Sequence, residues 1–225
     1  MKNALPTMHG SWSIWLASTL MGVLNYFDLF GVVLSFLLLF SIQPLHRFLK
    51  DGVATSLLAF PALFALTVMG AAVKNNVVLT ILVPYALLFL VQFLVRGKLR
   101  AYIVLGAPIL TLPFPLITAM SGESIGNFLN LWILLSLIAL YSVLLADSII
   151  FENGKEFNIV RKRRLLAVLI ILVTAMYQLS PIQFFLPVIG LTVSITFMAG
   201  KISVKKLGLS LLFLQLFFAF ISYFS

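Results

Sequence analysis

The chain has 225 residues, of which 62% are hydrophobic and only 9% are charged, and its mean hydropathy is +1.17. Soluble domains carry about 25% charged residues, so this composition excludes a water-soluble globule and indicates a membrane protein. Lys and Arg number 15 against 6 Asp and Glu, which gives a net charge of +9, and there are no cysteines. The lack of cysteine excludes disulfides, thiol nucleophiles and Cys-ligated metal sites.

Nine apolar segments follow one another along the chain, separated by charge clusters or by Gly, Pro and Asn turns. A membrane-spanning helix needs about 20 apolar residues. The segments are residues 11–24, 29–45, 53–73, 77–95, 101–120, 128–151, 165–179, 183–199 and 207–224. We therefore expect an all-α, polytopic transmembrane bundle of about nine spans that forms one integral membrane domain over residues 1–225. A single long broken helix is the alternative for the first two segments, which are short.

The distribution of basic residues orients this bundle. With the N-terminus in the cytoplasm, 14 of the 15 Lys and Arg residues fall on the cytoplasmic side, and only Lys74 falls outside. This agrees with the positive-inside rule and places the C-terminus outside. Merging the first two segments would place Lys2 and Arg47 on opposite sides. The sequence therefore predicts a multi-pass protein of a prokaryotic plasma membrane, with anionic phospholipids at its cytoplasmic face as partners and no nucleic acid.

Both histidines of the chain fall at one predicted corner on the cytoplasmic face, where the first segment begins and the second ends. This corner contains His9, Trp12, Gln43, His46, Arg47 and Asp51. A histidine at a helix N-terminus is held neutral by the helix dipole, so His9 is a candidate catalytic base or ligand. The alternative is an ordinary histidine at the membrane interface.

The other residues of this corner are candidates for substrate binding. The Gln43 amide can bind a headgroup or replace the hydrogen bond that Pro44 removes. The planar guanidinium of Arg47 can hold a phosphate, or it can extend to anionic lipid without a specific ligand. Trp12 and Trp15 fit the belt of aromatic residues found at membrane surfaces.

The sixth segment carries Asp147 about one turn from its predicted cytoplasmic end. The helix dipole and the nearby hydrocarbon both disfavour a carboxylate there, so Asp147 should have a partner. We interpret it as a catalytic acid or as part of a cation or headgroup site, and a salt-bridged loop anchor is the alternative. The four basic residues 161–164 are expected in the loop that follows, where anionic lipid alone would attract them.

Two further polar features lie within the predicted spans. Pro113 and Pro115 near the middle of the fifth segment free backbone carbonyls, which predicts a kink or, alternatively, a cavity. Gln215 in the last segment is expected to make a hydrogen bond between helices.

The segment from Pro6 through His9, Gly10 and Trp12, followed by Gln43-Pro44-Leu45, resembles the YwiC-like family of bacterial and archaeal membrane proteins. Met8 and Ile42 stand where that family usually has an acid and an arginine. The resemblance covers motifs in the first quarter of the chain. It implies a membrane protein of similar size and hydropathy, and it implies no activity.

The expected architecture is also similar to that of UbiA-type intramembrane prenyltransferases, which have nine helices with the N-terminus inside. In that family magnesium diphosphate lies between two Asp-rich motifs in the loops after the second and sixth spans. Here Asp51 falls in the first of those loops, and Asp147, Glu152 and Glu156 fall in or beside the second. Neither loop has a complete motif, so no metal ligand is assigned and the cofactor is left undetermined.

Three hypotheses for function follow from these features. The first is an enzyme that binds or modifies an isoprenoid or other lipid at the cytoplasmic face. The second is a non-catalytic accessory or lipid-binding membrane protein. The third is a facilitator for a small solute, since ion-coupled transport usually requires ionisable groups near the middle of the bilayer and the sequence offers none there.

Overall fold

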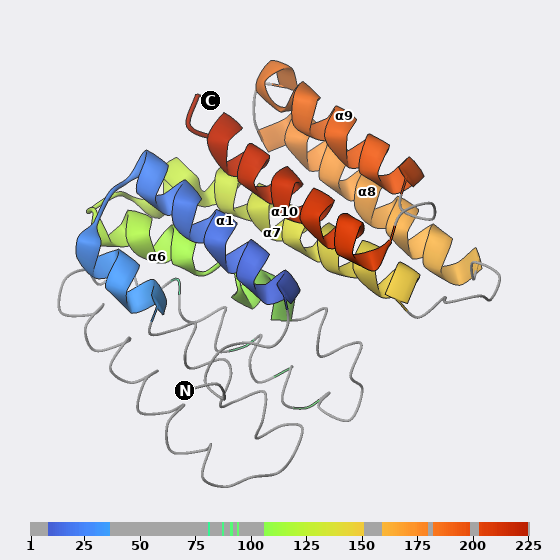
Figure 1. The fold of residues 1–225 in the computed structure, drawn as a ribbon. Coiled ribbons are helices and arrows are strands. Elements are labelled where there is room, and N and C mark those ends of the chain that lie inside the picture. The colour runs from blue at the N-terminus through green and yellow to red at the C-terminus, as the bar shows by residue number, and fades with distance from the viewer. Residues whose placement is uncertain are drawn as a thin grey trace, which may run out of the picture.

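The structure is a computed structural model that describes residues 9–36, 81, 87, 91, 94, 106–150, 159–179, 182–198 and 203–224. Over these residues all regular structure is helical, which confirms the predicted all-α class as far as the description reaches (Figure 1). The helices are α1 (His9–Asn25), α6 (Pro113–Met120), α7 (Ile125–Ile150), α8 (Ile159–Leu179), α9 (Ile182–Met198) and α10 (Val204–Ile221). Further helical residues lie at 29–36 and 106–109.

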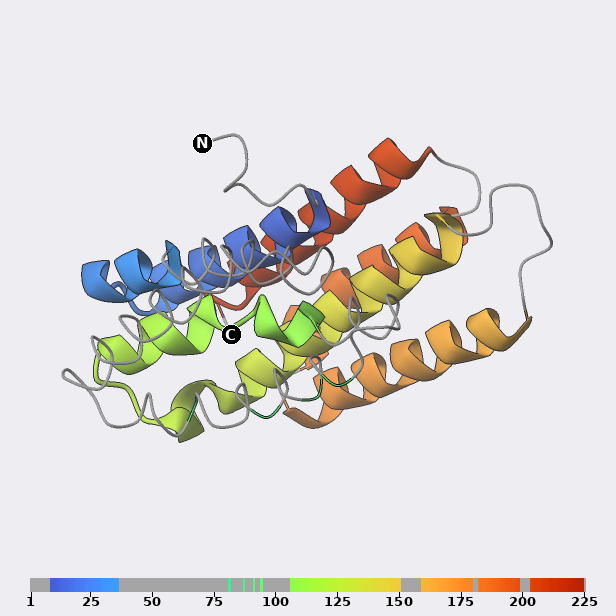
Figure 2. The ribbon, with the colours of Figure 1, turned by 90° about the horizontal axis from the view of Figure 1, so that it is seen from below.

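The described helices alternate in direction along one axis. In both views α7 and α9 run opposite to α1, α8 and α10 (Figures 1 and 2). As a result, α1, α8 and α10 begin at the same end of the bundle at which α7 and α9 end. Successive membrane spans are expected to alternate in direction in this way.

Helix α7 is the centre of the described bundle, since it contacts α1, α6, α8 and α10. Its buried face includes Phe128, Leu134, Ile138 and Tyr141. Residues Gly126–Ala146 have a mean hydropathy of 2.3 and form the one helix, within the described ranges, that is long and apolar enough to cross a membrane. Shorter apolar helices occupy Gly106–Met120, Leu166–Gln178 and Phe185–Met198. The predicted number of nine spans is therefore not established by the described residues.

Local sequence signals explain several helix starts. Asp28 precedes the helix at 29–36, and its Oδ1 accepts a hydrogen bond from the Gly31 N–H at 2.7 Å. Ser203 caps α10 by accepting from the Lys206 N–H. Pro113 opens α6, where its missing N–H removes no intrahelical bond. These caps satisfy amide groups that the first turn of a helix leaves unpaired.

Two glycines let the first helical hairpin approach α6 closely. A Cβ atom added to Gly22 of α1 would lie 3.0 Å from the Ile117 Cβ. One added to Gly31 would lie only 2.8 Å from the Ile117 Cα, which is backbone. Both helices of the hairpin therefore pack directly on Ile117, a contact that larger residues would prevent.

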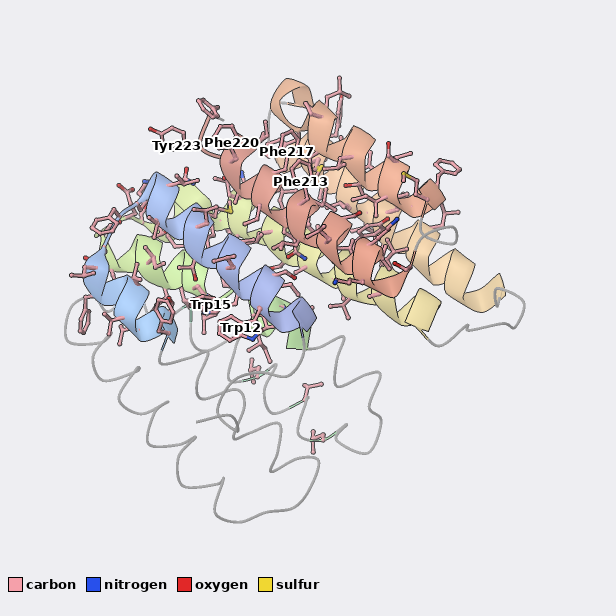
Figure 3. All side chains as sticks on the ribbon, in the orientation of Figure 1. Trp12, Trp15, Phe213, Phe217, Phe220 and Tyr223 are labelled. Atoms are coloured by element: carbon pink, nitrogen blue, oxygen red, sulfur yellow. The ribbon has the colours of Figure 1, made fainter. Side chains whose placement is uncertain are left out.

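The prediction that Trp15 belongs to an aromatic belt at the membrane surface is wrong. Its side chain is 3% exposed, and its Nε1–H donates to the Ser35 carbonyl at 3.1 Å, so it joins α1 to the helix at 29–36. A residue this buried cannot belong to an aromatic belt at the membrane surface. Trp12 is half-buried, and its ring meets that of Trp15 edge to face at 6.1 Å (Figure 3). The physical reason is that Trp15 lies on the face of α1 that packs against protein.

Candidate functional site

The fifth predicted segment is a broken helix. Its first helical residues end at 109, a turn occupies residues 110–112, and α6 begins at Pro113. Pro115 has no N–H, so the Thr111 carbonyl lacks its usual helical donor. Ser18 Oγ from α1 donates to that carbonyl at 2.6 Å. The kink predicted from Pro113 and Pro115 is thus an interruption of the α-helix at residues 110–112, and the freed Thr111 carbonyl is satisfied by another helix.

The break is surrounded by a connected set of hydrogen bonds, which we call the Ser18 network. Ser18 Oγ also accepts from the Phe114 N–H at 2.9 Å. Thr111 Oγ1 donates to the Pro108 carbonyl at 2.7 Å, lies 3.0 Å from Ser136 Oγ, and accepts from Trp132 Nε1–H at 3.3 Å. Ser18 and Thr111 are fully buried. Because its groups are paired with one another, the network fixes three helices in place rather than offering a reactive group.

For Gln215 the sequence predicts a hydrogen bond between helices. Gln215 is 1% exposed, and its Oε1 has no hydrogen-bond partner within the described part of the chain. Some hydroxyl groups bond to carbonyls of their own helix, as Ser142 does to Ile138 and Thr192 does to Val188, whereas the Tyr141 hydroxyl of α7 pairs with the Thr196 hydroxyl of α9.

The predicted catalytic residues lie at the same end of the bundle. His9 is the first residue of α1, and Asp147 lies in the last turn of α7 (Figure 1). Trp12 follows one turn after His9. The predicted partners Gln43, His46, Arg47 and Asp51 lie outside the described residues. Among the residues that are described, no three His, Cys, Asp or Glu side chains come together to hold a metal ion.

Basic residues gather at this same end. Within the described ranges, Lys and Arg occur only at 161–164, in the first two turns of α8, and at Lys205 and Lys206, in the first turn of α10. We call the end at which α1, α8 and α10 begin the basic end. The prediction that residues 161–164 belong to a loop is wrong, because Arg and Lys form helix readily and α8 begins at Ile159.

The helix dipole does not explain this placement. Cations at a helix N-terminus face the positive end of the dipole, which disfavours them by about 0.3–1 kcal/mol each when exposed. The basic residues therefore oppose the stability of α8 and α10 taken alone. Together with the backbone amides of the first turn, they make the basic end suited to anions.

The opposite end carries two of the described acids, and both are engaged locally. Asp28 caps a helix as described above, and Glu123 Oε2 accepts from Asn127 Nδ2 at 2.6 Å. Burial raises the pKa of the neighbouring Tyr26, and the Glu123 carboxylate raises that pKa further. The effect of Glu123 on Tyr26 places the turn after α1 near the turn before α7.

A groove lies between α9 and α10 on the side towards the basic end. Its volume is about 500 Å³, and it is lined by Leu191, Ser194, Ile195 and Met198 of α9 and by Leu209, Ser210, Leu212, Phe213 and Leu216 of α10. The side chains of Met198, Leu209 and Phe213 are exposed, whereas Ile195 is buried. This α9/α10 groove is open and almost entirely apolar. Sequence reasoning did not identify it.

The described elements define an all-helical bundle with an apolar central helix and a basic end. An uncharacterized protein of Archaeoglobus fulgidus is 32% identical to this chain over 215 residues, which cover 95% of this chain and 93% of the archaeal protein. The chain belongs to the same family as this archaeal protein. No family model matches the chain, and no solved structure matches it.

Proposed function

We propose that the protein is a multi-pass integral membrane protein that binds anionic lipid at its cytoplasmic face, with its N-terminus inside and its C-terminus outside. One observation carries the proposal: the described Lys and Arg residues lie at one end of a bundle whose outer faces are apolar. Such a separation suits a molecule in contact with hydrocarbon along its length and with headgroups at the basic end.

The outer faces of the last three helices expose large apolar side chains. They include Leu166, Ile170 and Ile171 of α8, Leu186 and Phe197 of α9, and Leu209, Phe213 and Phe220 of α10. Contiguous exposed apolar surface is rare in soluble monomers and marks contact with a membrane or a partner. These exposed residues occur on all three helices. A bilayer around the bundle would account for the exposed apolar side chains of all three helices at once.

The basic residues support the orientation. Each Lys or Arg near an anionic leaflet contributes about 1 kcal/mol of attraction, which matches or exceeds the unfavourable effect of the helix dipole. Placing residues 161–164 and Lys205 and Lys206 in the cytoplasm satisfies the positive-inside rule for every described Lys and Arg. The cytoplasmic leaflet is then the source of the anionic lipid.

Topology provides the direct test of this orientation. A periplasmic reporter such as alkaline phosphatase, fused after Ser225, should be active, whereas the same reporter fused after Lys155 should be inactive. The pair is matched, because both fusions carry the same reporter and differ only in position. Activity of the Lys155 fusion and inactivity of the Ser225 fusion would reverse the proposed orientation. Recovery of the untagged protein in the soluble fraction would contradict membrane integration.

A second candidate function is chemistry on the bound lipid. It is favoured by the position of His9 and Asp147, which belong to different helices and lie at the same end as the basic residues (Figure 1). In this role His9 is the base, and Asp147 is an acid or an orienting carboxylate. The lipid-binding proposal does not depend on this chemistry.

Lipid extracts distinguish an enzyme from a binding protein. If the protein modifies a lipid, cells producing it should contain a lipid species that is lost in a His9→Ala and Asp147→Asn double variant produced at the same level. General acid–base residues usually contribute about 10²–10⁴-fold to rate, so the product should fall below detection. Leu186→Ala, on an exposed face of α9, is the control. Identical extracts from wild type and the double variant would leave only the binding function.

A further inference from the structure

We propose that the α9/α10 groove holds one anionic phospholipid of the cytoplasmic leaflet, with its acyl chain in the groove and its phosphate at Lys205 and Lys206. This rests on the proposed function and specifies where on the molecule the lipid binds. The shape of the groove, its alignment with the two lysines and their charge support this assignment.

The groove has the shape of a site for an extended apolar chain. The lining residues of α9 follow one helical face from Leu191 to Met198, and those of α10 follow one face from Leu209 to Leu216. Each stretch advances by seven residues, which is about 10 Å along the helix axis. Buried Ile195 forms the floor, and exposed Met198, Leu209 and Phe213 form the walls. An acyl chain fits this surface because it makes apolar contacts along its whole length.

The polar atoms of the groove are already engaged. Ser194 Oγ donates to the Gly190 carbonyl at 2.8 Å, and Ser210 Oγ donates to the Lys206 carbonyl at 3.0 Å. Both hydroxyls therefore bond within their own helices. The groove recognises its occupant by apolar contact, and selectivity must come from groups at its end.

The two lysines lie in line with the groove. Lys205 precedes Leu209, Leu212 and Leu216 at helical spacings of four, seven and eleven, so these residues share one stripe of α10. Lys206 shares a neighbouring stripe with Ser210 and Phe213. The rise from Lys205 to Leu216 is about 16 Å, close to half of the roughly 30 Å hydrocarbon thickness of a bilayer. A lipid with its phosphate at the lysines would therefore extend its chain to about the middle of the membrane.

The charge at this end favours a phosphate. Lys205 and Lys206 are exposed, and they lie in the first turn of α10, where the positive end of the helix dipole adds to their charge. Phe213 is held in place by stacking on Phe217, with ring centroids 5.9 Å apart and planes at 11° (Figure 3). The positive charge at one end suits the phosphate of an anionic phospholipid, and the apolar α9/α10 groove beyond it suits the acyl chain.

Native mass spectrometry of the full-length protein tests the site. The protein is released from vesicles containing equal amounts of phosphatidylglycerol and phosphatidylcholine, and the lipid retained is measured. We expect wild type to retain phosphatidylglycerol preferentially. Lys205→Gln with Lys206→Gln should reduce that retention about tenfold or more, because two charges near the phosphate are lost. Ser194→Trp, which fills the groove, should reduce it similarly.

Two matched controls locate the effect. Arg163→Gln with Arg164→Gln removes the same charge from the basic end but from α8, and Leu186→Trp adds a large ring to α9 outside the groove lining. Leu186→Trp should retain the lipid as wild type does, and the α8 variant should lose less of it than the Lys205 and Lys206 variant does. If only the α8 variant loses lipid, the groove proposal is overturned and the proposed function stands. If wild type shows no preference for the anionic lipid, the proposed function fails as well.

The same measurement tests other occupants of the groove. Retention of an endogenous isoprenyl phosphate that added phosphatidylglycerol does not displace would overturn the choice of phospholipid. A dimer mass in wild type that disappears in Ser194→Trp would show that a second copy of the chain covers the groove. Either result would contradict the proposal, whereas lipid loss confined to the groove and lysine variants would support it.

Discussion

Ser18→Ala is expected to destabilise the protein by about 1–3 kcal/mol, because it leaves buried backbone groups without good partners. The Thr111 carbonyl loses its 2.6 Å donor, and the Phe114 N–H loses its 2.9 Å acceptor. Only the 3.3 Å hydrogen bond between these two groups remains. Thermal unfolding in detergent at a fixed scan rate should show a lower Tm. For a chain of this size each kcal/mol corresponds to about 2–4 °C.

Ser194→Ala is the matched control for this loss. It removes a hydroxyl from an exposed position whose hydrogen bond lies within one helix. Exposed substitutions of this kind usually change stability by less than about 0.5 kcal/mol. An equal Tm for the Ser18 and Ser194 variants would mean that the Ser18 network does not stabilise the break.

The second large effect is expected from Gly31→Ala. Alanine normally favours a helix over glycine by about 1 kcal/mol. Here its Cβ would lie 2.8 Å from the Ile117 Cα and 3.3 Å from the Met120 Cβ, so the hairpin must move away from α6. Overpacking of this kind costs about 1–3 kcal/mol. The measurement is again the Tm in detergent, together with the yield of monodisperse protein.

Gly208→Ala serves as the control for that substitution. Gly208 lies in α10, and a Cβ added there would meet nothing within 4 Å. The variant should therefore be as stable as wild type or slightly more stable, because only the helix preference acts. A Gly31→Ala protein with unchanged Tm would show that the hairpin and α6 can separate freely.

Hydropathy predicted the helical segments well wherever they are described. The ends predicted at residues 151, 179 and 199 lie close to Ile150, Leu179 and Met198. The starts of α8 and α10 were predicted too late, because Arg and Lys break an apolar pattern without breaking a helix. The apolar pattern therefore locates the apolar part of each helix but underestimates the length of the helix at a charged end.

Less of the candidate site than of the helical segments could be predicted from the sequence. The prolines at 113 and 115 correctly indicated freed carbonyls, but the donor, Ser18, is 93 residues away from Thr111 and resembles any other serine in the sequence. The α9/α10 groove was missed because its lining residues are ordinary apolar residues of two separate helices. Such features depend on which helices are neighbours, and hydropathy carries no information about neighbours.

The contact between α1 and α10 has a consequence for assembly. About 180 residues separate the end of α1 at Asn25 from the start of α10 at Val204, so at about 5–20 residues per second the ribosome needs roughly 10–40 s between them. During that interval the face of α1 that will contact α10 has no permanent neighbour. Helix α1 must therefore wait for α10, and a chain truncated before Val204 should be a preferred substrate for membrane proteases.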